Sequence, residues 1–162
     1  MPAEVQPVKA GYGPGPLAFA LILLSLLLLW LAACGTPGGG MVVPEPYRGA
    51  SPPTEGFLTD PANLEAGQRL YQRHCATCHG ETGRGDGPAG HVLSLKPANL
   101  ADPTGVAQKP PDYWFWRVSE GGTVEPFHSQ GSVMPAWKYH LSEIERWQVI
   151  AFARTLHVTT AK

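Results

Sequence analysis

The sequence predicts an all-α fold for residues 60–162, with helices joined by loops that are rich in glycine and proline. Three stretches of this region place apolar side chains at the spacing of a helix, and each follows a residue pattern typical of a helix start. No stretch alternates apolar and polar residues convincingly enough for a strand. We therefore expect one small domain of about three to five helices.

The chain divides into three parts by composition. Residues 1–33 contain an uncharged apolar run, which predicts an export signal or a membrane anchor. Residues 34–59 are rich in glycine and then in proline without an apolar period, so we expect a flexible linker that has no fixed structure. Residues 60–162 hold the predicted helices. The charge is nearly balanced, with 12 Lys plus Arg against 13 Asp plus Glu, and this indicates no nucleic-acid partner.

The end of the apolar run resembles a bacterial lipobox. Residues 31–35 read LAACG, and in a lipobox the cysteine receives a diacylglyceryl group before the chain is cleaved ahead of it. On this resemblance Cys34 is lipidated and begins the mature chain. The alternative is an uncleaved membrane helix over residues 17–33, whose length of about 25 Å is slightly short of a hydrocarbon core of about 30 Å. Under either interpretation we expect attachment to membrane lipid at the outer face of the bacterial cytoplasmic membrane.

The three predicted helices have recognisable ends. The first begins with Asp60 as a capping carboxylate and Pro61 at the first helical position. The second is expected after Pro110-Pro111, carries a run of aromatic side chains and is terminated by Gly121-Gly122. The third opens with a capping box at residues 142–145, SEIE. Its apolar side chains continue at helical spacing toward the C-terminus.

The segment that follows the first helix carries the clearest chemical motif. Residues 75–79 read CATCH, and two thiols one helical turn apart with an imidazole directly after them form an attachment site for c-type haem. Thioethers from Cys75 and Cys78 would place His79 beneath the iron as its proximal ligand. A zinc site is an alternative, but no second pair of ligands has a matched spacing. A thioredoxin-like dithiol is another, although it would require a strand-to-helix turn that the flanks do not predict.

The second axial ligand of such a haem is predicted in a loop downstream. Met134 is the only methionine of residues 60–162, and it lies between Gly131 and Pro135 in a segment that can approach the iron. Its thioether is a soft ligand that favours ferrous iron and raises the reduction potential. His128 is the alternative ligand.

Residues 60–158 resemble the monohaem class I cytochromes c. The resemblance rests on the CATCH motif, the loop at residues 80–90 with Gly87-Pro88, the KPANL stretch at residues 96–100, Met134-Pro135, and a C-terminal helix with Trp147 and Phe152. It implies a small cytochrome c fold that encloses one haem c, bound through two thioethers. It also implies that the backbone carbonyl of Pro88 accepts a hydrogen bond from the His79 imidazole. The resemblance further implies that the first and last helices cross at Gly67, with Tyr71 packed against Phe152 and Leu156.

Two axial ligands would leave the iron without a vacant position, so we expect no catalytic residue and no small-molecule substrate. The expected function is one-electron transfer with redox protein partners at the membrane. Covalent haem attachment takes place outside the cytoplasmic membrane in bacteria, which agrees with the export signal. One alternative is a haem relay subunit of a larger respiratory, photosynthetic or nitrogen-oxide-reducing complex. Another is a haem enzyme or gas sensor.

Overall fold

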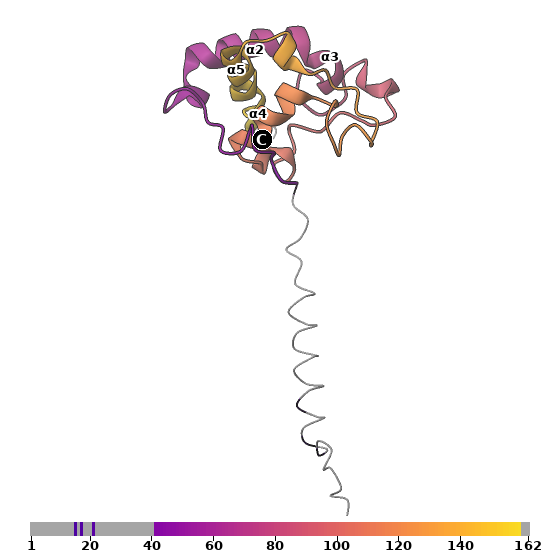
Figure 1. The fold of residues 1–162 in the computed structure, drawn as a ribbon. Coiled ribbons are helices and arrows are strands. Elements are labelled where there is room, and N and C mark those ends of the chain that lie inside the picture. Colours follow the sequence, from indigo (N-terminus) through magenta and orange to yellow (C-terminus); the bar gives the residue numbers. More distant parts are fainter. Residues whose placement is uncertain (1–14, 16, 18–20, 22–40, 160–162) are drawn as a thin grey trace, which may run out of the picture. The chain divides into compact units, whose positions relative to one another are not determined.

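The computed structural model describes residues 15, 17, 21 and 41–159 (Figure 1). The chain separates into two compact units, Met1–Val42 and Val43–Lys162. The predicted lipid site at Cys34 and most of the predicted signal or anchor segment lie outside the described residues. Over the part that is described, no helix is both long enough and apolar enough to cross a membrane.

The second unit is built from short helices. Its described part contains five α-helices, which are α2 (Pro61–His74), α3 (Ala76–His79), α4 (Pro111–Glu120), α5 (Glu143–Ala153) and α6 (Leu156–Thr159). Four 3₁₀ helices lie between or before them, namely η1 (Phe57–Thr59), η2 (Gly90–Val92), η3 (Val106–Gln108) and η4 (Trp137–Tyr139). No strand occurs in residues 41–159, so the predicted all-α fold class is confirmed.

The helix starts that the sequence predicts are present. The Asp60 side chain accepts a hydrogen bond of 3.0 Å from the backbone N–H of Asn63, and Pro61 occupies the first helical position of α2. At the start of α5 the Ser142 hydroxyl accepts from the backbone N–H of Glu145 at 3.3 Å, and the Glu145 carboxylate accepts from the backbone N–H of Ser142 at 2.9 Å. Each such cap contributes about 1 kcal/mol, which fixes where α2 and α5 begin.

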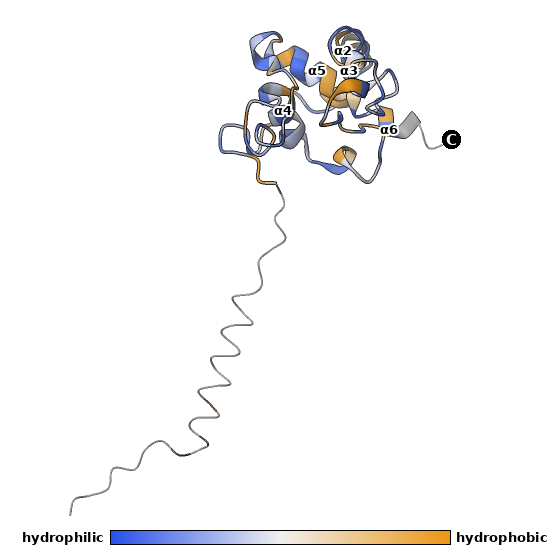
Figure 2. Cartoon of the chain, turned by 90° about the vertical axis from the view of Figure 1, so that its right-hand side faces the viewer, coloured by the Kyte–Doolittle hydropathy of each residue, from blue (hydrophilic) through white to orange (hydrophobic). Residues whose placement is uncertain are grey.

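Helices α2 and α5 pack directly on each other, and Figure 2 shows the hydrophobic stretch of α5 beside α2. Gly67 permits this approach, because a Cβ atom there would lie 1.9 Å from the backbone oxygen of Gln148. One turn further along α2, the ring of Tyr71 contacts that of Phe152 with centroids 5.3 Å apart. The crossing at Gly67 and the contact between Tyr71 and Phe152 are therefore as the resemblance implies, and Leu156 lies in the same core cluster as Tyr71.

The core is dominated by aromatic side chains. Trp147 of α5 is fully buried, and its ring stacks on Phe115 of α4 with centroids 4.4 Å apart and planes 10° from parallel. A second, smaller cluster contains Tyr113, Trp116 and Phe127. Large rings bury much area for few rotatable bonds, which suits the core of a small domain.

Residues 43–59, which we call the N-terminal strap, pack against the helical domain. The Tyr47 hydroxyl donates a hydrogen bond to the Glu120 carboxylate, and its ring lies 6.1 Å from that of Phe115. Phe57 is buried in the main core cluster. The prediction of a flexible linker over residues 34–59 is therefore wrong for the strap. Its apolar residues are isolated between prolines and show no period, so their burial depends on partners far away in the sequence.

Candidate haem-binding site

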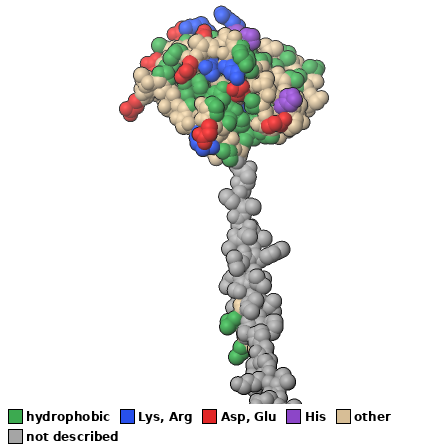
Figure 3. Space-filling view, in the orientation of Figure 1, with side chains coloured by type: hydrophobic (Ala, Val, Ile, Leu, Met, Phe, Trp, Pro, Cys, Tyr) green, Lys and Arg blue, Asp and Glu red, His purple; other side chains and the backbone are tan. Residues whose placement is uncertain are grey.

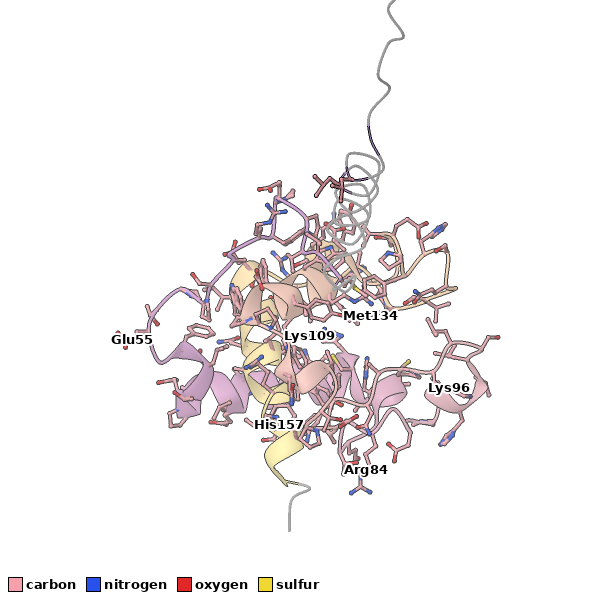
Figure 4. The ribbon with its side chains drawn as sticks, turned by 90° about the horizontal axis from the view of Figure 1, so that it is seen from below. Glu55, Arg84, Lys96, Lys109, Met134 and His157 are labelled. Atoms are coloured by element: carbon pink, nitrogen blue, oxygen red, sulfur yellow. The ribbon has the colours of Figure 1, made fainter. Side chains whose placement is uncertain are left out.

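A largely apolar cavity with a volume of about 270 Å³ lies within the helical domain. Its walls come from α2, α3, α4 and α5 and from the loops at residues 93–100 and 132–137. In the view of Figure 4, Met134 lies within the outline of the domain, whereas Glu55 and Arg84 lie at its edge. The lining contains four of the predicted site residues: Cys75, Cys78, His79 and Met134.

The two cysteines sit where α2 passes into α3. Cys75 ends α2, and its backbone carbonyl accepts hydrogen bonds from the N–H of Cys78 at 3.1 Å and of His79 at 2.9 Å. This single helical turn brings all three side chains to the cavity. Neither thiol is in a disulfide. Burial raises the pKa of the Cys75 thiol to about 12, and the neighbouring Cys78 adds to the increase. A reactive dithiol needs a lowered pKa, so the thioredoxin-like alternative is disfavoured.

The His79 imidazole is oriented by a backbone carbonyl. Its Nδ1 lies 3.1 Å from the oxygen of Ala98, and because a carbonyl can only accept, Nδ1 carries the proton. The lone pair is then on Nε2, the other ring nitrogen. Burial lowers the pKa of His79 and the charge of Arg117 lowers it further, although the hydrogen bond to Ala98 opposes both. The neutral imidazole is the form that binds a metal ion.

The prediction that Pro88 supplies this carbonyl is wrong. Pro88 is exposed and is not among the described residues that line the cavity. The turn that contains it is held against the outside of α3, where the backbone N–H of Gly87 donates to the Cys78 carbonyl at 3.2 Å. The accepting residue, Ala98, lies instead in the KPANL stretch, which the resemblance included but to which it gave no role.

Met134 reaches the cavity from a loop that is bound to the end of α4. The backbone N–H of Gly122 donates to the Met134 carbonyl at 2.8 Å. Gly121 has φ 58°, and a Cβ atom there would lie 2.2 Å from the oxygen of Pro135. The Arg117 guanidinium lies 3.9 Å from the Met134 sulfur and 3.3 Å above the centre of the Phe127 ring. Helix α4 therefore supports both the backbone and the side chain of the methionine.

The alternative ligand His128 is placed differently. It is exposed, it is not among the described residues that line the cavity, and its Nδ1 lies 3.6 Å from the Glu125 carboxylate. The structure thus brings Met134 to the cavity and not His128. The zinc alternative also finds no support, because residues 41–159 contain no group of three or more His, Cys, Asp or Glu side chains that could hold a metal ion.

The residues of the cavity fit a c-type haem. Two sulfur atoms for thioether bonds, one imidazole and one thioether line the same space, and the rest of the wall is mainly aliphatic and aromatic. Such a wall suits the flat, apolar body of a porphyrin, while nitrogen and thioether sulfur are the axial ligands of electron-transfer haems. Trp114 and Trp137 belong to the wall.

A small all-α domain whose CATCH segment opens onto an apolar cavity is a c-type cytochrome domain. Residues 62–152, more than half of the chain, match the family described as "Cytochrome C oxidase, cbb3-type, subunit III", and the chain belongs to this family. The domain therefore carries a covalently bound c-type haem and has the electron-transfer role of a cytochrome domain.

Comparison with curated proteins gave no match. Among solved structures, the chain is similar to one from the reducing HAO-like protein complex of Kuenenia stuttgartiensis, with 25% sequence identity and a TM-score of 0.49. The alignment covers 77% of this chain and 53% of that one, so the chain spans about half the length of this solved structure.

Proposed function

We propose that this protein is a one-electron carrier whose haem has His79 and Met134 as its two axial ligands. The observation that carries the proposal is that both side chains line the same apolar cavity as Cys75 and Cys78. We further propose that lipid on Cys34 tethers the carrier to the outer face of the bacterial cytoplasmic membrane.

The roles of the residues follow from their positions. The sulfur atoms of Cys75 and Cys78 hold the haem by thioether bonds, and the bound haem supplies a one-electron iron couple. Ala98 fixes the orientation of the His79 ring and leaves Nε2 free to donate its lone pair. Met134 supplies a soft sulfur ligand, which favours the ferrous state and raises the reduction potential.

Partner docking is expected at the mouth of the cavity. Leu95 and Val133 both line the cavity and are exposed, with 39% and 64% of their surface accessible. Exposed apolar side chains beside a redox centre suit the small, short-lived interfaces of electron-transfer partners. On the face that Figure 3 shows, positive and negative side chains are interspersed and do not gather by sign. Because the whole chain has a formal net charge of only -1 at pH 7, association with a partner should depend only mildly on salt.

The axial ligation is tested by replacing Met134 with Ala in the haem-loaded protein. We expect loss of the weak near-infrared band of methionine-ligated ferric haem and a clear fall in reduction potential, because the soft ligand is gone. His128→Ala is the matched control, and it should leave both unchanged. A Met134→Ala protein with the wild-type band and potential would refute the proposed ligand.

A second candidate function, a haem relay subunit of a larger membrane complex, is favoured by two observations. The matching family is described as a subunit of an oxidase. In addition, the strap packs from Val43 onward, so only residues 35–42 separate it from the proposed lipid site at Cys34. Fully extended, that stretch spans about 30 Å at most, which confines partners to the membrane surface. Retention in a complex through mild detergent washing would support the relay subunit, whereas a free carrier should be released.

A further inference from the structure

Glu120 occupies a position that is unfavourable for a negatively charged side chain. It is the last residue of α4, where a negative charge opposes the helix dipole, and only 9% of its surface is exposed. Burial by itself would raise the pKa of its carboxyl, but hydrogen bonds from Lys138 and Tyr47 outweigh this effect, so the pKa is lowered and the group is ionised at neutral pH. Neither the helix dipole nor solvation favours a carboxylate at this position. The ionised state of Glu120 must therefore depend on its hydrogen-bond partners.

The two partners come from segments that are distant in the sequence. Tyr47 lies 73 residues before Glu120, in the strap that Figure 1 shows beside α4, and its hydroxyl donates to Oε1. Lys138 lies 18 residues after Glu120, in η4, and its Nζ donates to both carboxylate oxygens at 2.9 and 2.8 Å. One carboxylate therefore ties the strap, α4 and η4 together.

This junction is close in the chain to the proposed ligand. Lys138 follows Met134 by four residues, and Gly122, which binds the Met134 carbonyl, follows Glu120 by two. The methionine segment is thus held to the end of α4 at two points, once by the backbone bond of Gly122 and once by the ion pair of Lys138. If the ion pair is lost, the segment that follows Met134 loses one of these two bonds to the end of α4, while its packing contacts with the domain remain.

We propose that Glu120 is a positioning residue for the Met134 ligand. By holding Lys138, and with it the segment after Met134, it keeps the methionine sulfur at the cavity. Its bond to Tyr47 couples the strap to the same segment. This inference rests on the proposed axial ligation by Met134, and it adds a residue that is neither a proposed haem ligand nor among the described residues that line the cavity.

The test measures how readily an added ligand replaces methionine in the ferric, haem-loaded full-length protein. Imidazole is the ligand used, because it is neutral near pH 8 and its approach is insensitive to a lost charge. For Glu120→Gln and Lys138→Gln we expect a weaker near-infrared methionine band and imidazole binding that is tighter by about tenfold or more, as loss of a charged hydrogen bond implies. Tyr47→Phe should act in the same direction but less, because Lys138 keeps its partner. Glu65→Gln, which removes an exposed ion pair on α2, is the matched control.

The outcomes separate this inference from the ligation on which it rests. If Glu120→Gln and Lys138→Gln only lower the unfolding temperature and keep the wild-type band and imidazole affinity, Glu120 is structural and the inference is overturned. If the wild-type protein itself has no methionine band, and Met134→Ala changes neither the spectrum nor the imidazole affinity, the proposed axial ligation by Met134 is refuted instead. Lys138 is partly exposed, with 31% of its side chain accessible, so its variant should fold even if Glu120→Gln does not.

Discussion

Replacing Gly67 with Ala tests the helix crossing on which the position of the haem-attachment segment depends. In an ordinary helix the change from Gly to Ala stabilises by about 1 kcal/mol, because Ala has the higher helix propensity. Here the new Cβ would lie 1.9 Å from the backbone oxygen of Gln148, whereas an unstrained contact needs about 3.4 Å. The two helices would have to separate by more than an ångström at their closest point.

The expected net effect is a destabilisation of about 2 kcal/mol, since overpacking of this severity costs about 3 kcal/mol and the propensity gain offsets about 1 kcal/mol. Denaturant unfolding of the haem-loaded protein, followed by far-ultraviolet circular dichroism, measures the change in the free energy of unfolding. Gln68→Ala, at an exposed position next to Gly67, is the control and should change stability by less than about 0.5 kcal/mol. A Gly67→Ala protein that is more stable than wild type would refute the close crossing.

Two further predictions concern acid stability and lipid attachment. The pKa of Glu120 is lower in the folded protein than its ordinary value of 4.5, so its contribution to stability is complete above that value and is lost as the pH falls through the folded-state pKa. Unfolding measured from pH 6 down to pH 3 should therefore show a steeper loss of stability in wild type than in Glu120→Gln, and equal slopes would contradict the assignment. Cys34→Ser should abolish lipid modification, as measured by mass spectrometry of the membrane fraction, and normal acylation of this variant would rule out the lipobox.

The features that were predictable from the sequence are those whose causes lie within a few residues. The CATCH motif brings two thiols and an imidazole together within one helical turn, and the caps at Asp60 and Ser142 satisfy backbone groups three residues away. Each of these patterns contains both partners of the interaction. The helix starts and the CATCH motif could therefore be recognised before any tertiary contact was known.

Other features depend on partners that no local pattern contains. The carbonyl that orients His79 belongs to Ala98, 19 residues away, and the resemblance placed it at Pro88. The sequence predicts a linker where the strap lies, because the contact that stabilises the strap joins Tyr47 to Glu120 across 73 residues. In both cases the sequence between the partners is rich in glycine and proline, whose turns decide which segments meet.

The sequence by itself determined the fold class, the starts of the helices and the haem-attachment segment, because helix periodicity, capping and the CATCH spacing act over single turns. Only the tertiary structure decided that Met134 lines the cavity while His128 faces solvent, that Ala98 orients His79, and that the strap joins the domain. These outcomes depend on how the loops close over the core, and the free energy of that closure comes from burial between distant residues.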